Sequence, residues 1–173
     1  MLLFSHLSQH DRYLLLRNLV AAPILEEVLF RGVLIASLSA ASPDSSGRSN
    51  HLWLCLHAPL YFGAAHLHHL LERVRAGARL SSALGGVLAQ FAYTYVFGVL
   101  ASQLLLRTSS LCAAVAAHFI CNFMSLPDLS FLDADHALFR HRHALLALHA
   151  AGLVLFAALL GPCTLVFRPH SAY

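Results

Sequence analysis

Two adjacent glutamates and an arginine interrupt a leucine-rich stretch of the sequence, at Glu26, Glu27 and Arg31. An ionisable side chain in an apolar helix costs a few kcal/mol or more, so such residues usually face the protein interior and serve a function. Successive helical residues differ by about 100° around the axis, which turns the two carboxylates apart and sets Glu27 opposite Arg31. We therefore expect Glu27 to be the paired carboxylate and Glu26 a candidate general base. A buried ion network that only fixes helix packing is the alternative.

Histidines form a second cluster, in the stretch Phe62-Gly-Ala-Ala-His66-Leu-His68-His69. In a continuous helix, His66 and His69 share one face and His68 is turned away from them. His69 and Glu72 are expected near the membrane interface, where water reduces the cost of charge. A histidine that only makes packing hydrogen bonds is the alternative for each of them.

The third cluster, His118-Phe-Ile-Cys-Asn122, places an imidazole and a carboxamide four positions apart on one helix face. With Glu26 and His66, these side chains form a set suited to acyl transfer. A glutamate can take a proton from water, one histidine can orient that water, and a histidine with an asparagine can bind the oxyanion of a tetrahedral intermediate. The sequence has no G-x-S-x-G motif that would favour a covalent serine route.

The same side chains include candidate metal ligands. Glu26, His66 and His118 could supply three ligands to zinc, but an HExxH motif is absent and the amide of Asn122 is a poor zinc ligand. The four cysteines show no CxxC pair, which argues against a cysteine zinc site or a disulfide framework. We favour a metal-free mechanism with no cofactor.

Chains of intramembrane Glu, Arg and His also build proton relays, so a transporter is a competing function. The inverted repeats common in transporters are not evident in the sequence. The formal net charge of +3 gives no case for nucleic-acid binding.

The elements that must position these residues are apolar helices. The chain is 58% hydrophobic and only 11% charged over 173 residues, a composition that favours a membrane protein. A spanning helix needs about 20 mostly apolar residues. Five segments meet or approach this length, so we predict an all-α fold, a polytopic transmembrane bundle with spans at residues 13–38, 52–71, 81–106, 111–126 and 144–167. The fourth is near the minimum length and could be tilted or half-buried.

These segments define a transmembrane domain over residues 13–167, with tails at residues 1–12 and 168–173. No cleaved signal peptide is expected, because the N-terminus lacks a basic region and a small-residue cleavage site. Pro23 has no N–H to donate, so it is expected to kink the first helix and leave a carbonyl unpaired. The positive-inside rule makes cytosolic the side that carries most of the arginines, namely Arg12, Arg17, Arg73, Arg75, Arg79, Arg140 and Arg142.

Aromatic residues in the third segment offer a further candidate site. Gln90, Tyr93 and Phe97 lie on roughly one helix face and could line a slot for an isoprenoid chain. Ordinary helix packing is the alternative explanation for such a stripe.

The ordered motifs Glu26-Glu27-x-x-x-Arg31, Phe62-x-x-x-His66 and His118-x-x-x-Asn122 resemble those of the CAAX protease and bacteriocin-processing superfamily. Within it, the chain is most similar to the type II CAAX prenyl endopeptidases of the endoplasmic reticulum membrane. The resemblance extends over about residues 14–127. Members of this family usually have about eight spanning helices, so the chain is expected to lack the N-terminal ones.

The resemblance implies a role for each residue. Glu26 would activate the hydrolytic water with His66, while His118 and Asn122 would stabilise the oxyanion and Glu27 and Arg31 would support the site. The substrates would be farnesylated or geranylgeranylated CAAX proteins such as small GTPases, cut after the prenylated cysteine, with membrane lipid as the other partner. An inactive, truncated relative that binds prenylated tails without cutting them is the alternative, together with a zinc-dependent version of the protease.

Overall fold

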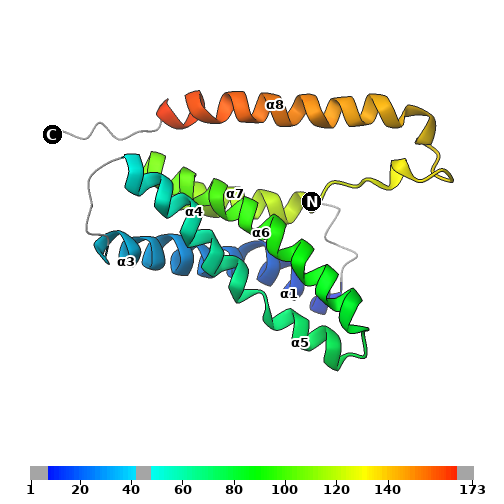
Figure 1. Ribbon diagram of the computed structural model, residues 1–173, viewed down its shortest axis with the longest axis horizontal. Helices are drawn as coiled ribbons and strands as arrows, with labels where there is room; N and C mark the ends of the chain where they lie inside the picture. Colours follow the sequence, from blue (N-terminus) through cyan, green and yellow to red (C-terminus); the bar gives the residue numbers. More distant parts are fainter. Residues whose placement is uncertain (1–7, 42–47, 167–173) are drawn as a thin grey trace.

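The computed structural model describes residues 8–41 and 48–166, and every regular element in these ranges is a helix. The predicted all-α class is therefore confirmed for this part of the chain. The predicted C-terminal tail, residues 168–173, lies outside the described residues, as do residues 42–47 between the first two segments. Figure 1 gives the arrangement of the helices.

The first helical segment runs without a break from Gln9 to Ala41, but its hydrogen-bond register changes twice. It begins four residues earlier than expected, because Ser8 and Asp11 form a reciprocal capping box at its start. Two π-helical turns, in which the bonds are one residue longer than in an α-helix, separate three α-helical parts. In order, the parts are α1 (Gln9–Leu16), η1 (Arg17–Ala21), α2 (Ala22–Glu27), η2 (Val28–Val33) and α3 (Leu34–Ala41).

The second predicted segment is split into α4 (Arg48–Ala65) and α5 (His68–Arg75). The amide groups of His66 and Leu67 bond three residues back, to Gly63 and Ala64, which tightens the helix into a turn between them. The remaining helices agree with the prediction within a few residues. They are α6 (Leu80–Thr108), α7 (Leu111–Met124) and α8 (Arg142–Val166), with 3₁₀ turns η3 (Ser130–Leu132) and η4 (Phe139–His141) before α8.

Helices α4 and α6 run side by side, and glycines allow their close approach (Figure 1). A Cβ atom on Gly98 would lie 2.7 Å from Cβ of Pro59, and one on Gly63 would lie 2.8 Å from the Phe91 ring. The first helix and α7 pack against this pair. The four elements that carry the chemical clusters therefore meet in one bundle.

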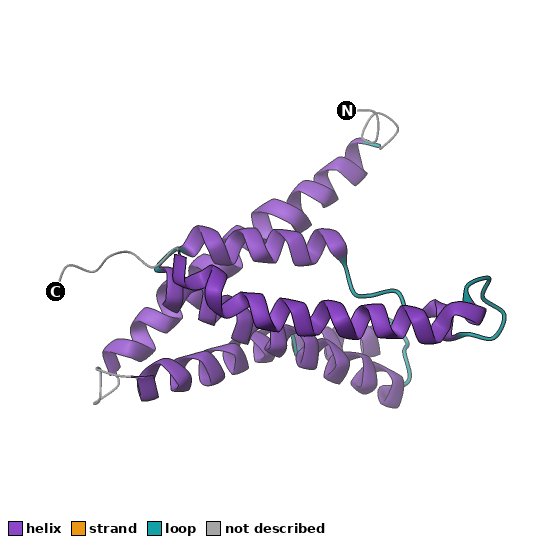
Figure 2. Ribbon diagram, turned by 90° about the horizontal axis from the view of Figure 1, so that it is seen from above, coloured by secondary structure: helices purple, strands orange, loops and turns teal. Residues whose placement is uncertain are grey.

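Helix α8 lies along one side of the bundle (Figures 1 and 2). Much of its apolar surface is uncovered. The helix is tied to α6 by a hydrogen bond of 3.1 Å from Arg107 Nη1 to Thr164 Oγ1. Leu148, Leu153 and Val154 are each more than 60% exposed. A surface this apolar suits contact with lipid rather than water.

Two unbroken helices among the described residues are long and apolar enough to cross a membrane, namely Leu80–Thr108 and Phe139–Thr164. Helix α7 is apolar but has only 14 residues. The first helix and α4 were also expected to span, but neither contains one helix that is both long enough and apolar enough to cross a membrane. The structure thus supports a membrane protein and, by this measure, identifies fewer spans than the five predicted.

Candidate active site

Glu27, Arg31 and His118 form a buried network at the centre of the bundle. One carboxylate oxygen, Oε1 of Glu27, lies 3.1 Å from Nη1 of Arg31 and 2.7 Å from Nδ1 of His118. The side chains of Glu27 and Arg31 are 0% and 1% exposed, and that of His118 is 7% exposed. The predicted pairing of Glu27 with Arg31 is confirmed. The hydrogen bond between Glu27 and His118 of α7 was not predicted. A carboxylate on Nδ1 fixes the imidazole ring and leaves Nε2 free to face a reactant.

Glu26 reaches the other nitrogen of the same ring. Its Oε2 atom lies 3.6 Å from Nε2 of His118, and its side chain is 33% exposed. The two adjacent glutamates therefore lie on opposite nitrogens of one histidine. Glu27 is buried, while Glu26 remains accessible to water or substrate.

Two phenylalanines enclose this network. The guanidinium carbon of Arg31 lies 4.4 Å from the centre of the Phe62 ring and 5.6 Å from that of Phe97. Phe97 also lies 4.6 Å from the His118 ring. The rings stabilise the buried cation through their π faces and exclude water from the ion pair. Of the predicted isoprenoid-slot residues, Phe97 contacts the network, and Tyr93, one helical turn earlier on α6, is 42% exposed.

His66 lies at the turn that ends α4. Its Nδ1 atom is bonded to the carbonyl oxygen of Phe62 at 2.8 Å, so the ring donates there and its Nε2 atom remains available. Phe62 lies between the two histidines, 5.0 Å from the His66 ring and 6.2 Å from the His118 ring. No hydrogen bond joins His66 to Glu26 in the described structure.

Asn122 reaches across from α7 to the first helix. Its Nδ2 atom donates a hydrogen bond of 3.0 Å to the carbonyl oxygen of Asn18. That carbonyl is free because its α-helical partner, the amide of Ala22, bonds Arg17 instead, and Pro23 has no N–H. The unpaired carbonyl expected beside Pro23 is therefore present, and Asn122 satisfies it.

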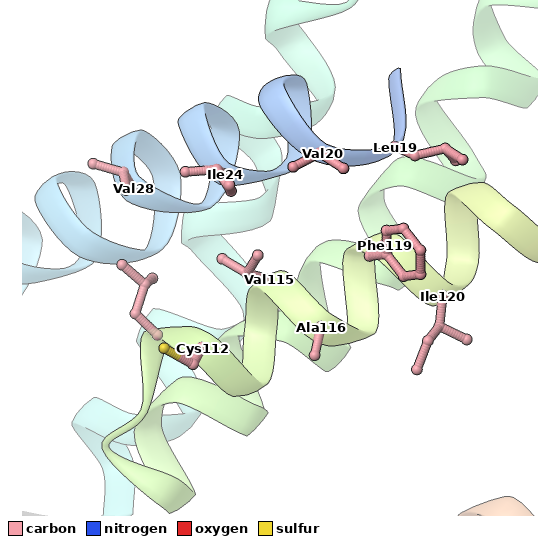
Figure 3. Close-up of a pocket in the computed structure, with 10 residues that line it drawn as sticks. Leu19, Val20, Ile24, Val28, Cys112, Val115, Ala116, Phe119 and Ile120 are labelled. Atoms are coloured by element: carbon pink, nitrogen blue, oxygen red, sulfur yellow. The ribbon is translucent and has the colours of Figure 1, made fainter. Parts of the chain in front are cut away.

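An apolar groove of about 680 Å³ lies between the first helix and α7 (Figure 3). Ile24 and Val28 contribute to one wall, and Val115 and Phe119 to the other. The lining offers no carboxylate or imidazole, so hydrolytic chemistry cannot take place in the groove itself. Both walls nevertheless belong to the helices that carry Glu26, Glu27 and His118.

A family model, described as type II CAAX prenyl endopeptidase Rce1-like, matches residues 8–124 of the chain. The chain belongs to this family. The match includes every candidate residue from Glu26 to Asn122.

Several curated members of the family are similar to the chain. It is 36% identical over 153 residues to CAAX prenyl protease 2 of Homo sapiens, covering 86% of this chain and 42% of the human protein. It is 38% identical over 117 residues to CAAX prenyl protease 2 of Arabidopsis thaliana, covering 65% of this chain and 35% of that protein. The probable CAAX prenyl protease 2 of Schizosaccharomyces pombe is 38% identical over 115 residues. The chain spans about two fifths of the length of these relatives, and no solved structure matches it significantly.

The candidate zinc ligands Glu26, His66 and His118 of this Rce1-like chain do not lie close enough together to share an ion. Among the described residues, one group of three ligand atoms lies within 4.8 Å of one another, and it consists of His68, His69 and Glu72. Glu26, His66 and His118 do not form such a group. These three side chains, as they are placed, do not fit a bound zinc ion.

The prediction that His68 turns away from His69 is wrong. Their ring centres are 4.0 Å apart, and both rings face Glu72. His68 and His69 lie four and three positions before Glu72 in α5, so both rings can turn toward its carboxylate although the two side chains leave the helix about 100° apart. Sequence reasoning also missed the bond between Glu27 and His118 and the enclosing role of Phe62. The bond has no local signal, because 91 positions separate its partners.

Proposed function

We propose that the chain is the catalytic part of an intramembrane endopeptidase that removes the last three residues of prenylated CAAX proteins. The family supports this class of substrate. The observation that carries the proposal is the placement of one histidine, His118, between a buried carboxylate and a half-exposed one. Two carboxylates and a histidine are costly in an apolar protein, and such costly groups usually serve a function. Here the accessible carboxylate, that of Glu26, is suited to act as a base.

In the proposed mechanism, Glu26 takes a proton from water while His66 orients that water through its free Nε2 atom. The water oxygen bonds to the carbonyl carbon of the prenylated cysteine, and the carbonyl oxygen becomes an oxyanion. His118, protonated at Nε2, and Asn122 donate hydrogen bonds to that oxyanion. The C–N bond then breaks, and the proton held by Glu26 passes to the leaving amine of the tripeptide.

Glu27 and Arg31 are positioning residues in this mechanism. Glu27 accepts a hydrogen bond from Nδ1 of His118, so it stabilises a doubly protonated ring that can donate from Nε2. Arg31 neutralises the charge of Glu27, and Phe62 and Phe97 keep the pair dry. Asn122 is bonded to Asn18 through one amide hydrogen, which leaves its second N–H for the oxyanion.

The isoprenoid chain is proposed to follow the α6 face of Gln90, Tyr93 and Phe97. Phe97 lies against His118, and Tyr93 is exposed one helical turn away, so the face leads outward from the site. The substrates would include small GTPases with farnesyl or geranylgeranyl tails. A lipid-attached substrate would enter from the bilayer, because its prenyl group is already buried there.

We further propose a multi-pass protein of the endoplasmic reticulum membrane, with the α5 end of the bundle and the loop before α8 in the cytosol. The arginines in these two regions support that orientation. All five helical segments would then cross or enter the bilayer, with α7 short and the first helix carrying π turns inside protein contacts. The mechanism uses no metal, in keeping with the ligand geometry.

The test is release of the terminal tripeptide from a farnesylated CAAX peptide by membranes that contain the chain. Glu26→Gln should reduce the rate at least about 100-fold, because it removes the base with little change of shape. Asp133→Asn is the matched control, since Asp133 is exposed and lies in the loop between η3 and η4. It should leave the rate unchanged.

Three results would count against the proposal. Binding of the prenylated peptide without any release by the unchanged chain would favour the inactive relative. Strict loss of release on metal chelation with rescue by zinc would favour a metalloprotease. Equal cleavage of an unprenylated peptide would remove the proposed substrate class.

A further inference from the structure

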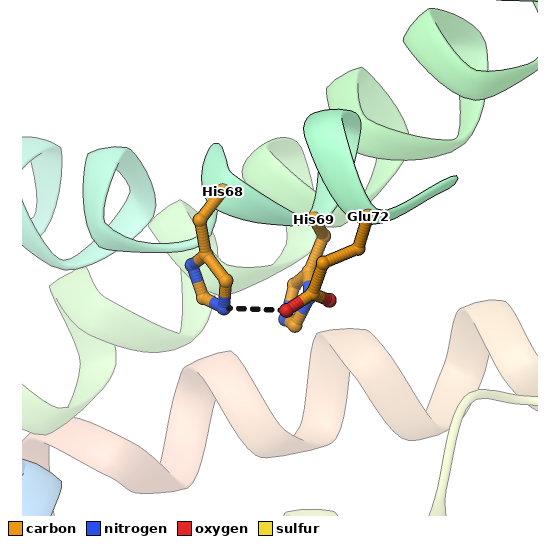
Figure 4. Close-up of side chains that lie close together, drawn as sticks. All are labelled: His68, His69 and Glu72. Atoms are coloured by element: carbon orange, nitrogen blue, oxygen red, sulfur yellow. Dashed lines mark hydrogen bonds and ion pairs between the residues drawn. The ribbon is translucent and has the colours of Figure 1, made fainter. Parts of the chain in front are cut away.

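A second polar cluster lies outside the proposed active site, on the outer surface of α5. His68, His69 and Glu72 project from one helical turn toward a common point (Figure 4). Nδ1 of His69 lies 2.7 Å from Oε2 of Glu72, and Nε2 of His68 lies 3.9 Å from Oε1 of the same carboxylate. The proposed mechanism uses none of these three side chains.

We propose that His68, His69 and Glu72 form a binding site for a divalent transition-metal ion, with Zn²⁺ as the best match. Two imidazoles and one carboxylate are ligands that zinc favours, and Mg²⁺ and Ca²⁺ prefer oxygen ligands alone. Water would complete a four-coordinate ion. The site differs from the zinc ligand set considered above, because it shares no residue with Glu26, His66 and His118.

The tautomer of His68 suits metal binding. Its Nδ1 atom lies 2.6 Å from the carbonyl oxygen of Ala65, so it carries the proton and donates it there. The lone pair is therefore on Nε2, the nitrogen that faces Glu72. Histidine ligands of metals typically donate their other N–H to a carbonyl or carboxylate in this way.

His69 and Glu72 already hold a proton between them, which an ion could replace. Ligand atoms around a tetrahedral zinc ion lie about 3.3 Å apart. The three atoms here lie within 4.8 Å of one another, and small side-chain rotations close the difference.

These rotations are not obstructed. The side chains of His68, His69 and Glu72 are 58%, 34% and 62% exposed. The nearest arginine along the chain, Arg73, points toward α6, where its guanidinium covers Gly86. Its charge is therefore directed away from the proposed zinc site.

The test is a zinc titration of the full chain in detergent micelles, against a chromophoric chelator. One equivalent should bind, and His68→Ala and His69→Ala should each weaken binding about tenfold or more. Co²⁺ in place of Zn²⁺ should give visible absorption bands that both variants lose. Hydrogen exchange of the α5 amides should slow when zinc is added, because an ion that links three residues of one turn stabilises the helix.

Two controls separate this site from others. His143→Ala, an exposed histidine in the segment before α8, should bind zinc as the unchanged chain does. Glu26→Gln should also retain binding. Zinc affinity unchanged by both His68→Ala and His69→Ala, or lost in Glu26→Gln, would overturn the proposal. Neither result depends on peptidase activity, so the outcome is independent of the proposed function.

Discussion

The carboxylate of Glu27 accepts a hydrogen bond of 2.7 Å from Nδ1 of His118, a residue 91 positions further along the chain. The same oxygen also binds Arg31, and the other carboxylate oxygen has no partner in the described structure. One buried atom therefore connects the first helix to α7. The consequence is that changes at Glu27 should affect both the stability of the bundle and the orientation of the histidine.

Glu27→Gln should reduce both properties. The substitution keeps the shape but leaves Arg31 as an uncompensated buried cation, for which about 3–5 kcal/mol of unfolding free energy is expected to be lost. Tripeptide release should fall about 100-fold or more, because the ring of His118 loses the charge that orients it. Unfolding in detergent and steady-state kinetics would measure the two effects.

The control for this prediction is the pair Glu27→Gln and Arg31→Met in one chain. Removing both charges should recover part of the lost stability, since neither charge is then left unpaired. Activity should not recover, because His118 still lacks its carboxylate. Stability losses that simply add would contradict the ion pair as the cause.

Gly98→Ala should destabilise the bundle by about 1–3 kcal/mol, as overpacking in a close-packed interior does. The new methyl group would lie 2.7 Å from Cβ of Pro59 and 3.1 Å from Nη2 of Arg31, and a proline ring cannot rotate away. Gly85→Ala on the same helix is the matched control, because its Cβ would have no neighbour within 4 Å. It should be neutral or slightly stabilising. Equal midpoints of thermal unfolding for the two variants would refute the close approach of α4 and α6.

Asn122→Ala should have a small effect on folding and a large effect on rate. The exposed bond to the Asn18 carbonyl is worth about 0.5–1.5 kcal/mol, as hydrogen bonds in proteins generally are. If Asn122 donates to the oxyanion as proposed, its loss should lower kcat about 10²–10³-fold and leave KM nearly unchanged. A rise in KM with constant kcat would instead assign Asn122 to ground-state binding or to helix packing.

Much of this arrangement was predictable from the sequence, for identifiable reasons. Apolar runs located the helices, and the four-residue spacing located the pair of Glu27 and Arg31, because both signals are local. Pro23 predicted a free carbonyl for the same reason. The donor to that carbonyl, Asn122, depends on how α7 packs against the first helix, and a single sequence does not carry that information.

The turn at His66 and Leu67 has no proline or glycine at those two positions to signal it, so the split of the second segment was not predicted. His68 and His69 both follow that turn, and their rings meet because both face Glu72, which lies four and three positions further along α5. The two π turns similarly shift the first helix without a compositional signal beyond Pro23. The positions of the helices were therefore predictable from the sequence. The direction in which side chains point after a change in the helical hydrogen-bond register was not.

The ion pair of Glu72 and His69 should depend on pH. The pKa of the Glu72 carboxyl is lowered, first by its hydrogen bond with His69 and then by the charges of His69 and His68. A carboxyl with a depressed pKa contributes stability above its unfolded pKa, and this contribution is lost as pH falls through the folded pKa. The helicity of α5 should therefore decrease as the pH falls through the lowered pKa of Glu72. Carbon NMR of the Glu72 carboxyl should give a midpoint below that of free glutamate, and His69→Ala should raise it; an unchanged midpoint would contradict the pairing.

Tyr93→Ala should weaken binding of the prenyl chain if α6 guides it. Loss of apolar contact with an aromatic ring is worth about 1.5–3 kcal/mol, so KM for a farnesylated peptide should rise about tenfold or more. Val96→Ala is the control, because Val96 is 68% exposed and lies off the predicted Gln90, Tyr93 and Phe97 face. It should leave KM unchanged.

The apolar groove between the first helix and α7 provides the decisive comparison for this prediction. Ala116→Trp would place a large ring among the groove residues, at an exposed position of α7. If the α6 face holds the isoprenoid, this variant should keep the KM of the unchanged chain while Tyr93→Ala raises it. The reverse result, a raised KM for Ala116→Trp alone, would place the isoprenoid in the groove and leave Tyr93 as a packing residue.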